Sequence, residues 1–288
     1  MGLGRAHEVS LKVYLTLGRV SNLPTVWTNA LAGAVLAGHP ATGSVVLAAL
    51  ALTAFYIGGM WLNDAFDADI DAQERANRPI PNGEISREAV FRGGFGLLLL
   101  GIVLAFLTGT DAGLVGLCLA GVVLLYDWLH KRTVLSPVIM GGARFFSYLV
   151  AALSVGHMTG NVIWGALGLM AYTAGLTYAA KQEAYDRLDN AWPLLVLIAP
   201  LLYALWQTGG VLLALALWIG LIVSVLFALY RLFRRDAGDV PKAVVTLIAG
   251  MALYDAVLIA GAGYGLLALL GLAGFVLTLA LQWIVSGT

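Results

Sequence analysis

The sequence predicts an all-α integral membrane protein: a polytopic transmembrane helical bundle of about nine or ten helices, forming a single domain over residues 1–288. Two observations predict this fold class. Of the 288 residues, 60% are hydrophobic and only 11% are charged, a composition far from that of a soluble domain. The chain also contains ten apolar stretches, each near the roughly 20 residues that a helix needs to cross a hydrocarbon layer about 30 Å thick.

Long uninterrupted apolar runs favour helices over the alternating strands of a membrane barrel. A glycine-rich turn between Gly261 and Gly265 separates the last two stretches. The predicted spans are 20–38, 43–63, 89–108, 112–128, 136–156, 162–182, 191–207, 211–231, 242–262 and 265–285.

Basic residues are distributed unevenly along the chain. Fifteen of the 16 Lys and Arg precede the first predicted span or lie in or beside the loops after the second, fourth, sixth and eighth spans. By the positive-inside rule, we expect a multi-pass protein whose N-terminus and these loops face the cytoplasm. The first residues lack an apolar segment with a cleavage site, so no removable signal peptide is expected.

The polar loop after the second span contains four aspartates within eight residues. If the helix continues beyond Trp61, then Asp64, Asp67 and Asp71 share one face and Asp69 points elsewhere. Clustered carboxylates repel one another unless a cation lies between them, and hard oxygen ligands suit Mg²⁺ bound together with substrate phosphates. Asn63 adds a neutral oxygen or an amide donor. A calcium loop is disfavoured, because its glycine and terminal glutamate positions hold Ala72 and Arg78.

A second acidic cluster follows the sixth span, on the same predicted side. Glu183, Asp186 and Asp189 recur every three residues, although Lys181 and Arg187 are interleaved and a solvated surface helix is the alternative. The loop after the fourth span adds Lys131 and Arg132, which can neutralise phosphate or simply fix topology. Carboxylates for metal and cations for phosphate indicate a diphosphate site. Without a glycine-rich nucleotide loop, a lipid diphosphate is favoured over ATP.

The run N-D-x-x-D-x-x-x-D from Asn63 to Asp71, with R-P-I-P-x-G from Arg78 to Gly83, resembles the UbiA superfamily of intramembrane prenyltransferases. The resemblance extends from Ser21 to the loop after the sixth span. It implies about nine helices around a central cavity and two aspartate-rich motifs that bind Mg²⁺-complexed isoprenyl diphosphate. Its Tyr-x-x-x-Lys element corresponds to Tyr126 and Lys131, one residue further apart.

We therefore expect Mg²⁺-dependent transfer of an isoprenyl group from an isoprenyl diphosphate to a small acceptor, aromatic or a cyclic polyol, at a site facing the cytoplasm. The expected partners are these two substrates and the lipid bilayer, without nucleic acid. Expected metal ligands are Asp64, Asp67, Asp71, Glu183, Asp186 and Asp189; the expected catalytic residues are Asp64, Asp67, Asp71, Lys131 and Asp186. Expected substrate-binding residues are Asn22, Asn63, Arg78, Tyr126, Arg132, Arg144, Lys181 and Tyr185.

Two ionisable residues lie inside predicted spans, where charge is costly and usually functional. Arg144 and Asp255 can pair with each other, or Arg144 can bind an acidic acceptor; a structural pair is the alternative. Asn22 is expected to face the cavity. A transporter or lipid flippase is the main alternative function, since such proteins also hold buried charges, and a non-catalytic membrane scaffold is the third. The donor's chain length and the oligomeric state stay open.

Overall fold

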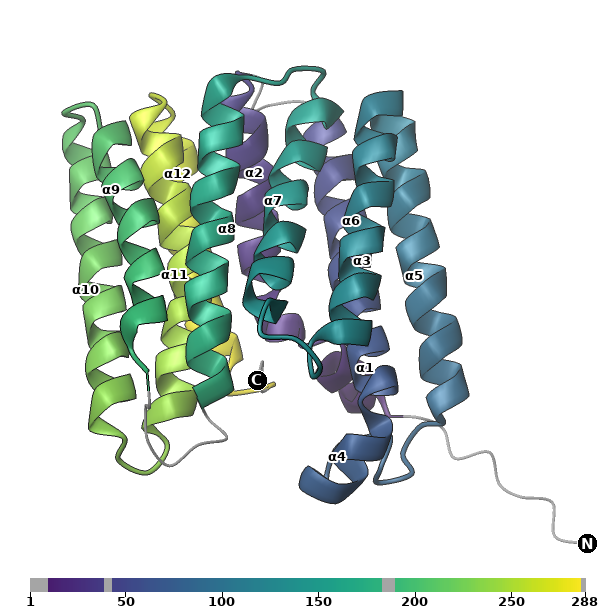
Figure 1. Ribbon diagram of the computed structural model, residues 1–288. Coiled ribbons are helices and arrows are strands. Elements are labelled where there is room, and N and C mark those ends of the chain that lie inside the picture. Colours follow the sequence, from purple (N-terminus) through teal and green to yellow (C-terminus); the bar gives the residue numbers. More distant parts are fainter. Residues whose placement is uncertain (1–9, 39–42, 183–189, 286–288) are drawn as a thin grey trace, which may run out of the picture.

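The computed structural model describes residues 10–38, 43–182 and 190–285, and all of their regular elements are helices. Figure 1 shows the long helices standing side by side as one bundle, with α10 and α5 on its two flanks and the short α4 at one end. The elements in chain order are α1 (Leu11–Leu17), η1 (Val20–Asn22), α2 (Leu23–Leu36), α3 (Gly43–Phe66), α4 (Ala68–Glu74), α5 (Arg87–Thr108), α6 (Thr110–Leu129), α7 (Ser136–Ser154), α8 (Gly160–Lys181), η3 (Trp192–Leu197), α9 (Ile198–Gln207), α10 (Leu212–Arg234), α11 (Asp239–Gly261) and α12 (Gly265–Leu281).

Each of the ten apolar stretches corresponds to a helix, which confirms the predicted fold class. Within the described residues, seven helices are long and apolar enough to cross a membrane: α3, α5, α6, α7, α8, α10 and α11. The others are shorter than the sequence suggests. The stretch 191–207 begins as the 3-10 helix η3, with Pro193 at its start, before α9 continues it.

The first predicted span, 20–38, also differs from expectation, because its regular helix α2 has only 14 residues. Arg19 adopts a left-handed backbone conformation with φ of 42°, and η1 then leads into α2. Pro24 lies in the first turn of α2, where the missing backbone N–H costs no helical hydrogen bond. This irregular entry is buried in protein: Ser21 is 0% and Asn22 is 5% exposed.

Helix α11 is the most enclosed of the seven spanning helices. Of its apolar window, 83% is buried inside the bundle, against 28% for each of the flanking helices α5 and α10. A helix that is apolar on all sides is expected in such a position, whereas the flanking helices present apolar side chains to lipid. The core cluster built around α11 also includes buried residues of α2, α7, α8 and α10.

Small residues allow the central helices to approach closely, as is usual in membranes. A Cβ atom on Gly33 of α2 would lie 2.7 Å from the backbone oxygen of Tyr148 in α7. One on Gly141 of α7 would lie 2.5 Å from the backbone oxygen of Met170 in α8. The α2–α7 and α7–α8 crossings therefore bring backbone into contact with backbone.

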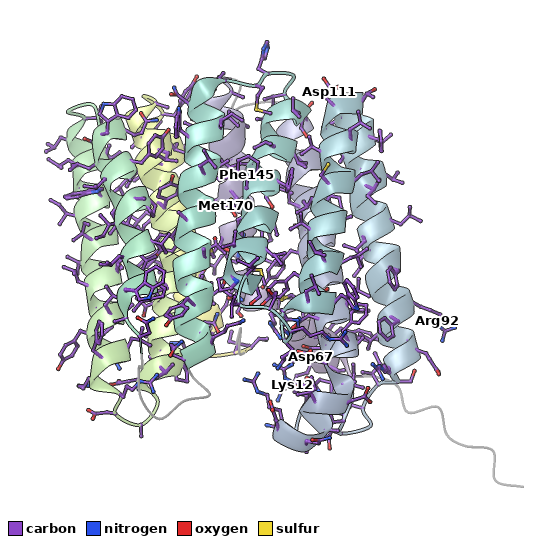
Figure 2. All side chains as sticks on the ribbon, in the orientation of Figure 1. Lys12, Asp67, Arg92, Asp111, Phe145 and Met170 are labelled. Carbon is purple, nitrogen blue, oxygen red and sulfur yellow. The ribbon has the colours of Figure 1, made fainter. Side chains whose placement is uncertain are left out.

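Polar contacts join several helix ends at one end of the bundle. Arg19 forms an ion pair with Asp64 of α3, and Lys181 at the end of α8 donates to the backbone oxygen of His130 after α6. Figure 2 shows Lys12 and Asp67 at this end and Asp111 at the opposite end. The grouping agrees with the charge pattern of the sequence, and its cytoplasmic orientation stays a prediction.

Candidate active site

The first aspartate cluster lies where α3 gives way to α4. Asp64, Asp67 and Asp71 are buried, with exposed fractions of 7%, 6% and 2%, whereas the side chain of Asp69 is 82% exposed. The spacing predicts this division. The helix is not continuous, because α3 ends at Phe66 and α4 starts at Ala68. Backbone bonds from Asp67 to Asn63 and from Asp71 to Asp67 keep the four-residue register across the break.

Two arginines neutralise this cluster. One nitrogen of Arg78, Nη1, donates to Asp64 Oδ1 at 3.0 Å and to Asp71 Oδ2 at 2.7 Å, so the two carboxylates face each other across it. Arg19 Nη2 donates to the same Asp64 oxygen at 3.0 Å. Burial by itself lowers the pKa of Arg19, but its neighbours, with Asp64 first among them, together outweigh burial and raise that pKa above its ordinary value. Arg19 is therefore a permanent cation.

Asp67 is paired with the end of α6 instead. His130 Nε2 lies 3.0 Å from Asp67 Oδ2, and Lys131 Nζ lies 3.9 Å from the same oxygen with its side chain 44% exposed. The Tyr126 ring stacks on the His130 ring with centroids 5.0 Å apart, because residues four apart share a helix face. Lys131 was predicted from the sequence and His130 was not. The four-residue spacing between Tyr126 and His130, which puts both rings on one helix face, is the signal in the sequence for His130.

An apolar cavity of about 80 Å³ lies between α2, α3, α6 and α7, and its lining includes Met60, one helical turn before Asp64. Asp127 lines it, and the sequence analysis did not select this residue. Its side chain is almost fully buried: Oδ1 accepts a hydrogen bond from Asn63 Nδ2 at 3.2 Å, and Oδ2 has no hydrogen-bond partner. The lining residues are Val26, Leu52, Phe55, Tyr56, Gly59, Met60, Leu119, Val123, Tyr126, Asp127, Met140, Ala143, Arg144 and Ser147.

Arg144 lines the same cavity from α7, with its guanidinium 5.8 Å from the centre of the Tyr56 ring. It donates to Asn29 Oδ1 at 2.6 Å and to Thr25 Oγ1 at 3.2 Å. Asn29 in turn donates to Asp255 Oδ2 at 2.7 Å. The suggested direct pairing of Arg144 with Asp255 is therefore wrong: an amide joins them.

Asp255 itself is sealed inside the bundle with an exposed fraction of 0%. Besides Asn29, Thr28 donates to Oδ2 at 2.6 Å and the Tyr148 hydroxyl donates to Oδ1. This cluster of Thr28, Asn29, Tyr148 and Asp255, together with Arg144, is called the buried network below. It connects α2, α7 and α11.

The remaining expected site residues lie in several places. Asn22 donates to the Tyr56 hydroxyl at 3.1 Å and accepts from Gln282 at 2.7 Å, so it lies behind the cavity wall. Lys181 holds the α6–α7 loop through backbone oxygens and Ser136 Oγ. Arg132 is exposed. Four predicted residues fall outside the described residues: Glu183, Tyr185, Asp186 and Asp189.

The carboxylate oxygens of the first cluster suit Mg²⁺ that is bound together with a further ligand. Among the described residues, no three acidic, histidine or cysteine side chains converge closely enough to hold an ion alone. Magnesium commonly takes one or two carboxylates and completes its shell with substrate phosphate and water. Asp64, Asp67 and Asp71 supply such oxygens, and the unpartnered Asp127 Oδ2 is a further buried carboxyl oxygen, linked to the cluster through Asn63. The residues fit a metal that arrives with a phosphate ligand.

The chain is similar to known membrane prenyltransferases. The chain is 27% identical to digeranylgeranylglyceryl phosphate synthase of Methanopyrus kandleri over 61% of this chain and 64% of that protein. It is 33% identical to protoheme IX farnesyltransferase of Rhizobium johnstonii over 49% of this chain and 46% of that protein. The alignments thus span less than two thirds of either relative.

Solved structures share the fold. One described as digeranylgeranylglyceryl phosphate synthase in membranes has a TM-score of 0.60 at 19% identity, covering 88% of this chain and 98% of that one. A UbiA homolog from Archaeoglobus fulgidus bound to GPP and Mg²⁺ has a TM-score of 0.51 at 15% identity, covering 93% and 98%. A model of the UbiA prenyltransferase family matches residues 24–253. This chain belongs to the UbiA prenyltransferase family.

Proposed function

We propose that this protein transfers an isoprenyl group from a Mg²⁺-complexed isoprenyl diphosphate to a small acceptor inside the bilayer. One observation carries the proposal: three buried aspartates, each paired with a cation, lie at and after the end of α3, and the preceding turn of α3 lines an apolar cavity. Buried carboxylates at a membrane protein's polar end are costly unless they bind something positive. A metal that brings a diphosphate explains both the acids and the cations around them.

Asp64, Asp67 and Asp71 would hold the metal, which supplies electrostatic stabilisation of the departing diphosphate. Arg78, which now donates to two carboxylates, is placed to donate to phosphate oxygens once the metal binds those carboxylates. His130 and Lys131 flank Asp67 and add positive charge. The apolar cavity excludes water, which would otherwise quench an allylic cation. Most of the rate then comes from preorganised charge.

The names of the relatives support the chemistry. Both describe isoprenoid-linked products or transferases, and two Archaeoglobus fulgidus structures of the same fold are bound to GPP or DMAPP together with Mg²⁺. We extend this to an aromatic or cyclic polyol acceptor, to a cytoplasmic site and to a second acidic cluster at Glu183, Asp186 and Asp189.

The test uses purified protein in lipid nanodiscs with labelled geranylgeranyl diphosphate and a titration of Mg²⁺. Diphosphate release and prenyl transfer to candidate acceptors are both measured. We expect both to require Mg²⁺ and to be lost in Asp64→Ala and Asp67→Ala. Asp69→Ala is the matched control, because it removes the same charge from an exposed position in α4, between Asp67 and Asp71, and it should retain activity.

Release that persists in Asp64→Ala and Asp67→Ala contradicts the site proposed here. A protein that binds none of the isoprenyl diphosphates in a Mg²⁺-dependent manner contradicts the enzyme assignment. Movement of an isoprenyl lipid across proteoliposomes without diphosphate release favours the transporter alternative.

A further inference from the structure

Lys181 was expected to bind substrate, but its ammonium group is bonded to the protein. Nζ donates to the backbone oxygens of His130 at 3.3 Å and Thr133 at 3.5 Å, and to Ser136 Oγ. An ammonium group carries three donor protons, so these three acceptors use all of them. The acceptors lie between the end of α6 and the first residue of α7. Lys181 therefore ties the end of α8 to the α6–α7 loop.

The α6–α7 loop also carries the residues that face Asp67. His130 is 8% exposed, and its Nε2 atom lies 3.0 Å from Asp67 Oδ2. Lys131 Nζ lies 3.9 Å from the same oxygen. One of the oxygens that Lys181 binds belongs to the backbone of His130 itself. Because His130 accepts from Lys181 through its backbone and contacts Asp67 through its ring, Lys181 determines where that ring lies.

A second cation holds the end of α8. Arg235 Nη2 donates to the backbone oxygen of Gln182 at 2.7 Å. Gln182 is the residue that caps α8, and it is 7% exposed. The last carbonyl groups of a helix have no partner within the helix and carry partial negative charge, so a guanidinium stabilises them. The end of α8 is therefore bonded both to the α6–α7 loop and to the turn between α10 and α11.

The turn between α10 and α11 holds Arg235 in an unusual conformation. Its φ is 57°, in the left-handed region that glycine adopts most readily. Asp239, which is 2% exposed, keeps the turn in this shape: it accepts from Arg231 Nη1 at 2.8 Å, from Arg234 Nε at 2.7 Å and from the backbone N–H of Asp236 at 3.2 Å. A strained backbone that the surrounding contacts maintain points to a task for the side chain it carries.

We infer that Lys181 and Arg235 are positioning residues: together they fix the end of α8, and Lys181 thereby keeps the His130 ring against Asp67. The inference rests on the proposed function and deepens it by assigning residues that act on the diphosphate site through other side chains. Lys181 has no donor proton left for a phosphate oxygen, so its effect passes through His130. Arg235 acts one step further away, through the backbone of Gln182.

A double-variant experiment separates this role from direct phosphate binding. Lys181→Met, His130→Ala and the combined variant are compared in nanodiscs, with KM and kcat for geranylgeranyl diphosphate measured by diphosphate release at saturating Mg²⁺. Methionine keeps the chain length and removes the donors. Lys242→Met is the matched control, because Lys242 is an exposed lysine in the first turn of α11.

We expect a rise of about tenfold in KM for each single variant, with kcat within about threefold of wild type, because each loses a hydrogen bond to a charged group. The combined variant should also stay near a tenfold rise, since two changes in one chain of contacts are not additive. Lys242→Met should leave KM within about twofold of wild type.

Arg235→Gly tests the second contact without distorting the turn, because glycine adopts the left-handed conformation freely. It should raise KM about threefold, a smaller effect than that of Lys181→Met because a backbone carbonyl lies between. In the Lys181→Met background it should raise KM no further. Arg235→Gly with wild-type KM overturns the role assigned to Arg235.

A spin label reports the α6–α7 loop without any catalysis. The label is attached at Val134→Cys, a 90% exposed position next to Thr133, and the exposed Cys118 is changed to alanine. The EPR spectrum should show faster motion in Lys181→Met and wild-type motion in Lys242→Met. An unchanged spectrum in Lys181→Met, or a KM that rises about 100-fold in the combined variant, overturns the inference. If wild type releases no diphosphate but Lys181→Met still frees the label, the proposed function is wrong and the contact that holds the loop is supported.

Discussion

The bundle contains two groups of buried carboxylates, and the side chains that satisfy them differ between the two groups. At its polar end, Asp64, Asp67 and Asp71 are each held by a cation, and the preceding turn of α3 lines the apolar cavity. In the middle of the bundle, Asp255 is held by two neutral donors and a tyrosine hydroxyl, and its nearest guanidinium, on Arg144, is reached through Asn29.

The contrast separates a binding site from a structural one. Hydrogen bonds from arginine and histidine can move to an arriving phosphate, so the first group exchanges partners at little cost. In the second group, side chains of α2 and α7 donate hydrogen bonds to both oxygens of Asp255. Breaking these bonds would leave a carboxyl group without partners in an apolar interior. Asp64, Asp67 and Asp71 should therefore control catalysis, and the buried network should control the stability of the fold.

The sharpest test is at Arg78, which bridges two carboxylates with one nitrogen. Arg78→Ala should lower kcat/KM for the isoprenyl diphosphate by about 10²-fold to 10³-fold, because it removes a preorganised phosphate donor. Arg75→Ala is the matched control, since Arg75 is exposed three residues away, and it should change kcat/KM by less than threefold. If Arg78→Ala and Arg75→Ala lower kcat/KM equally in steady-state assays, the positive charge of this segment matters and the position of Arg78 does not.

The second test concerns stability. Asp255→Ala should lower the free energy of unfolding by about 2–4 kcal/mol, because three buried donors lose their acceptor. Asp71→Ala should cost less than half as much, since Arg78 keeps its bond to Asp64. Unfolding in mixed detergent micelles measures both. If Asp71→Ala is the more destabilising variant, the division into binding and structural groups is wrong.

A third test addresses the crossing that holds the buried network together. Gly33→Ala should destabilise the bundle by about 1–3 kcal/mol, because the new methyl group overlaps the backbone of Tyr148. Gly96→Ala on α5 serves as its control, as nothing lies within 4 Å of the added atom. It should leave stability unchanged or slightly higher, since alanine favours helix. The same unfolding assay applies to both variants.

The smallest effect is expected at the end of α6. His130→Ala should raise KM for the isoprenyl diphosphate about tenfold, and Lys131→Ala about twofold, because only His130 is buried against Asp67 while exposed pairs contribute little. Steady-state titrations with the isoprenyl diphosphate give KM for both variants. A larger rise in KM for Lys131→Ala than for His130→Ala would favour Lys131, the residue predicted from the sequence.

The sequence predicts the helical bundle well, because apolar length is a direct consequence of bilayer thickness. It also predicts that Asp64, Asp67 and Asp71 share one face and that Asp69 points elsewhere, since helical spacing survives the break at Asp67; the structure adds that the shared face is buried. Element lengths at α2 and α9 were less predictable. There Pro24 and Pro193 lie in the first turn of a new helix, inside stretches that remain apolar throughout.

Partners across the bundle could not be read from spacing. Asp127 and Asn63 are 64 positions apart, and nothing in the sequence between them shows that the Asn63 amide donates to the Asp127 carboxyl group. His130 looked isolated for the same reason, because Asp67 lies on another helix. The sequence identifies Arg144 and Asp255 as intramembrane ionisable residues that can pair, but the Asn29 that joins them belongs to a third helix.

The short helix α2 has a consequence for how substrate arrives. Fourteen residues rise only about 21 Å, well below the roughly 30 Å of a hydrocarbon core, and the protein fills the difference with the buried turn at Arg19 and η1. The polar Arg19–Asp64 pair therefore occupies part of the length that an apolar helix would otherwise fill. On the proposed function, we expect a long isoprenoid to reach this site laterally from one leaflet, with its tail kept in hydrocarbon.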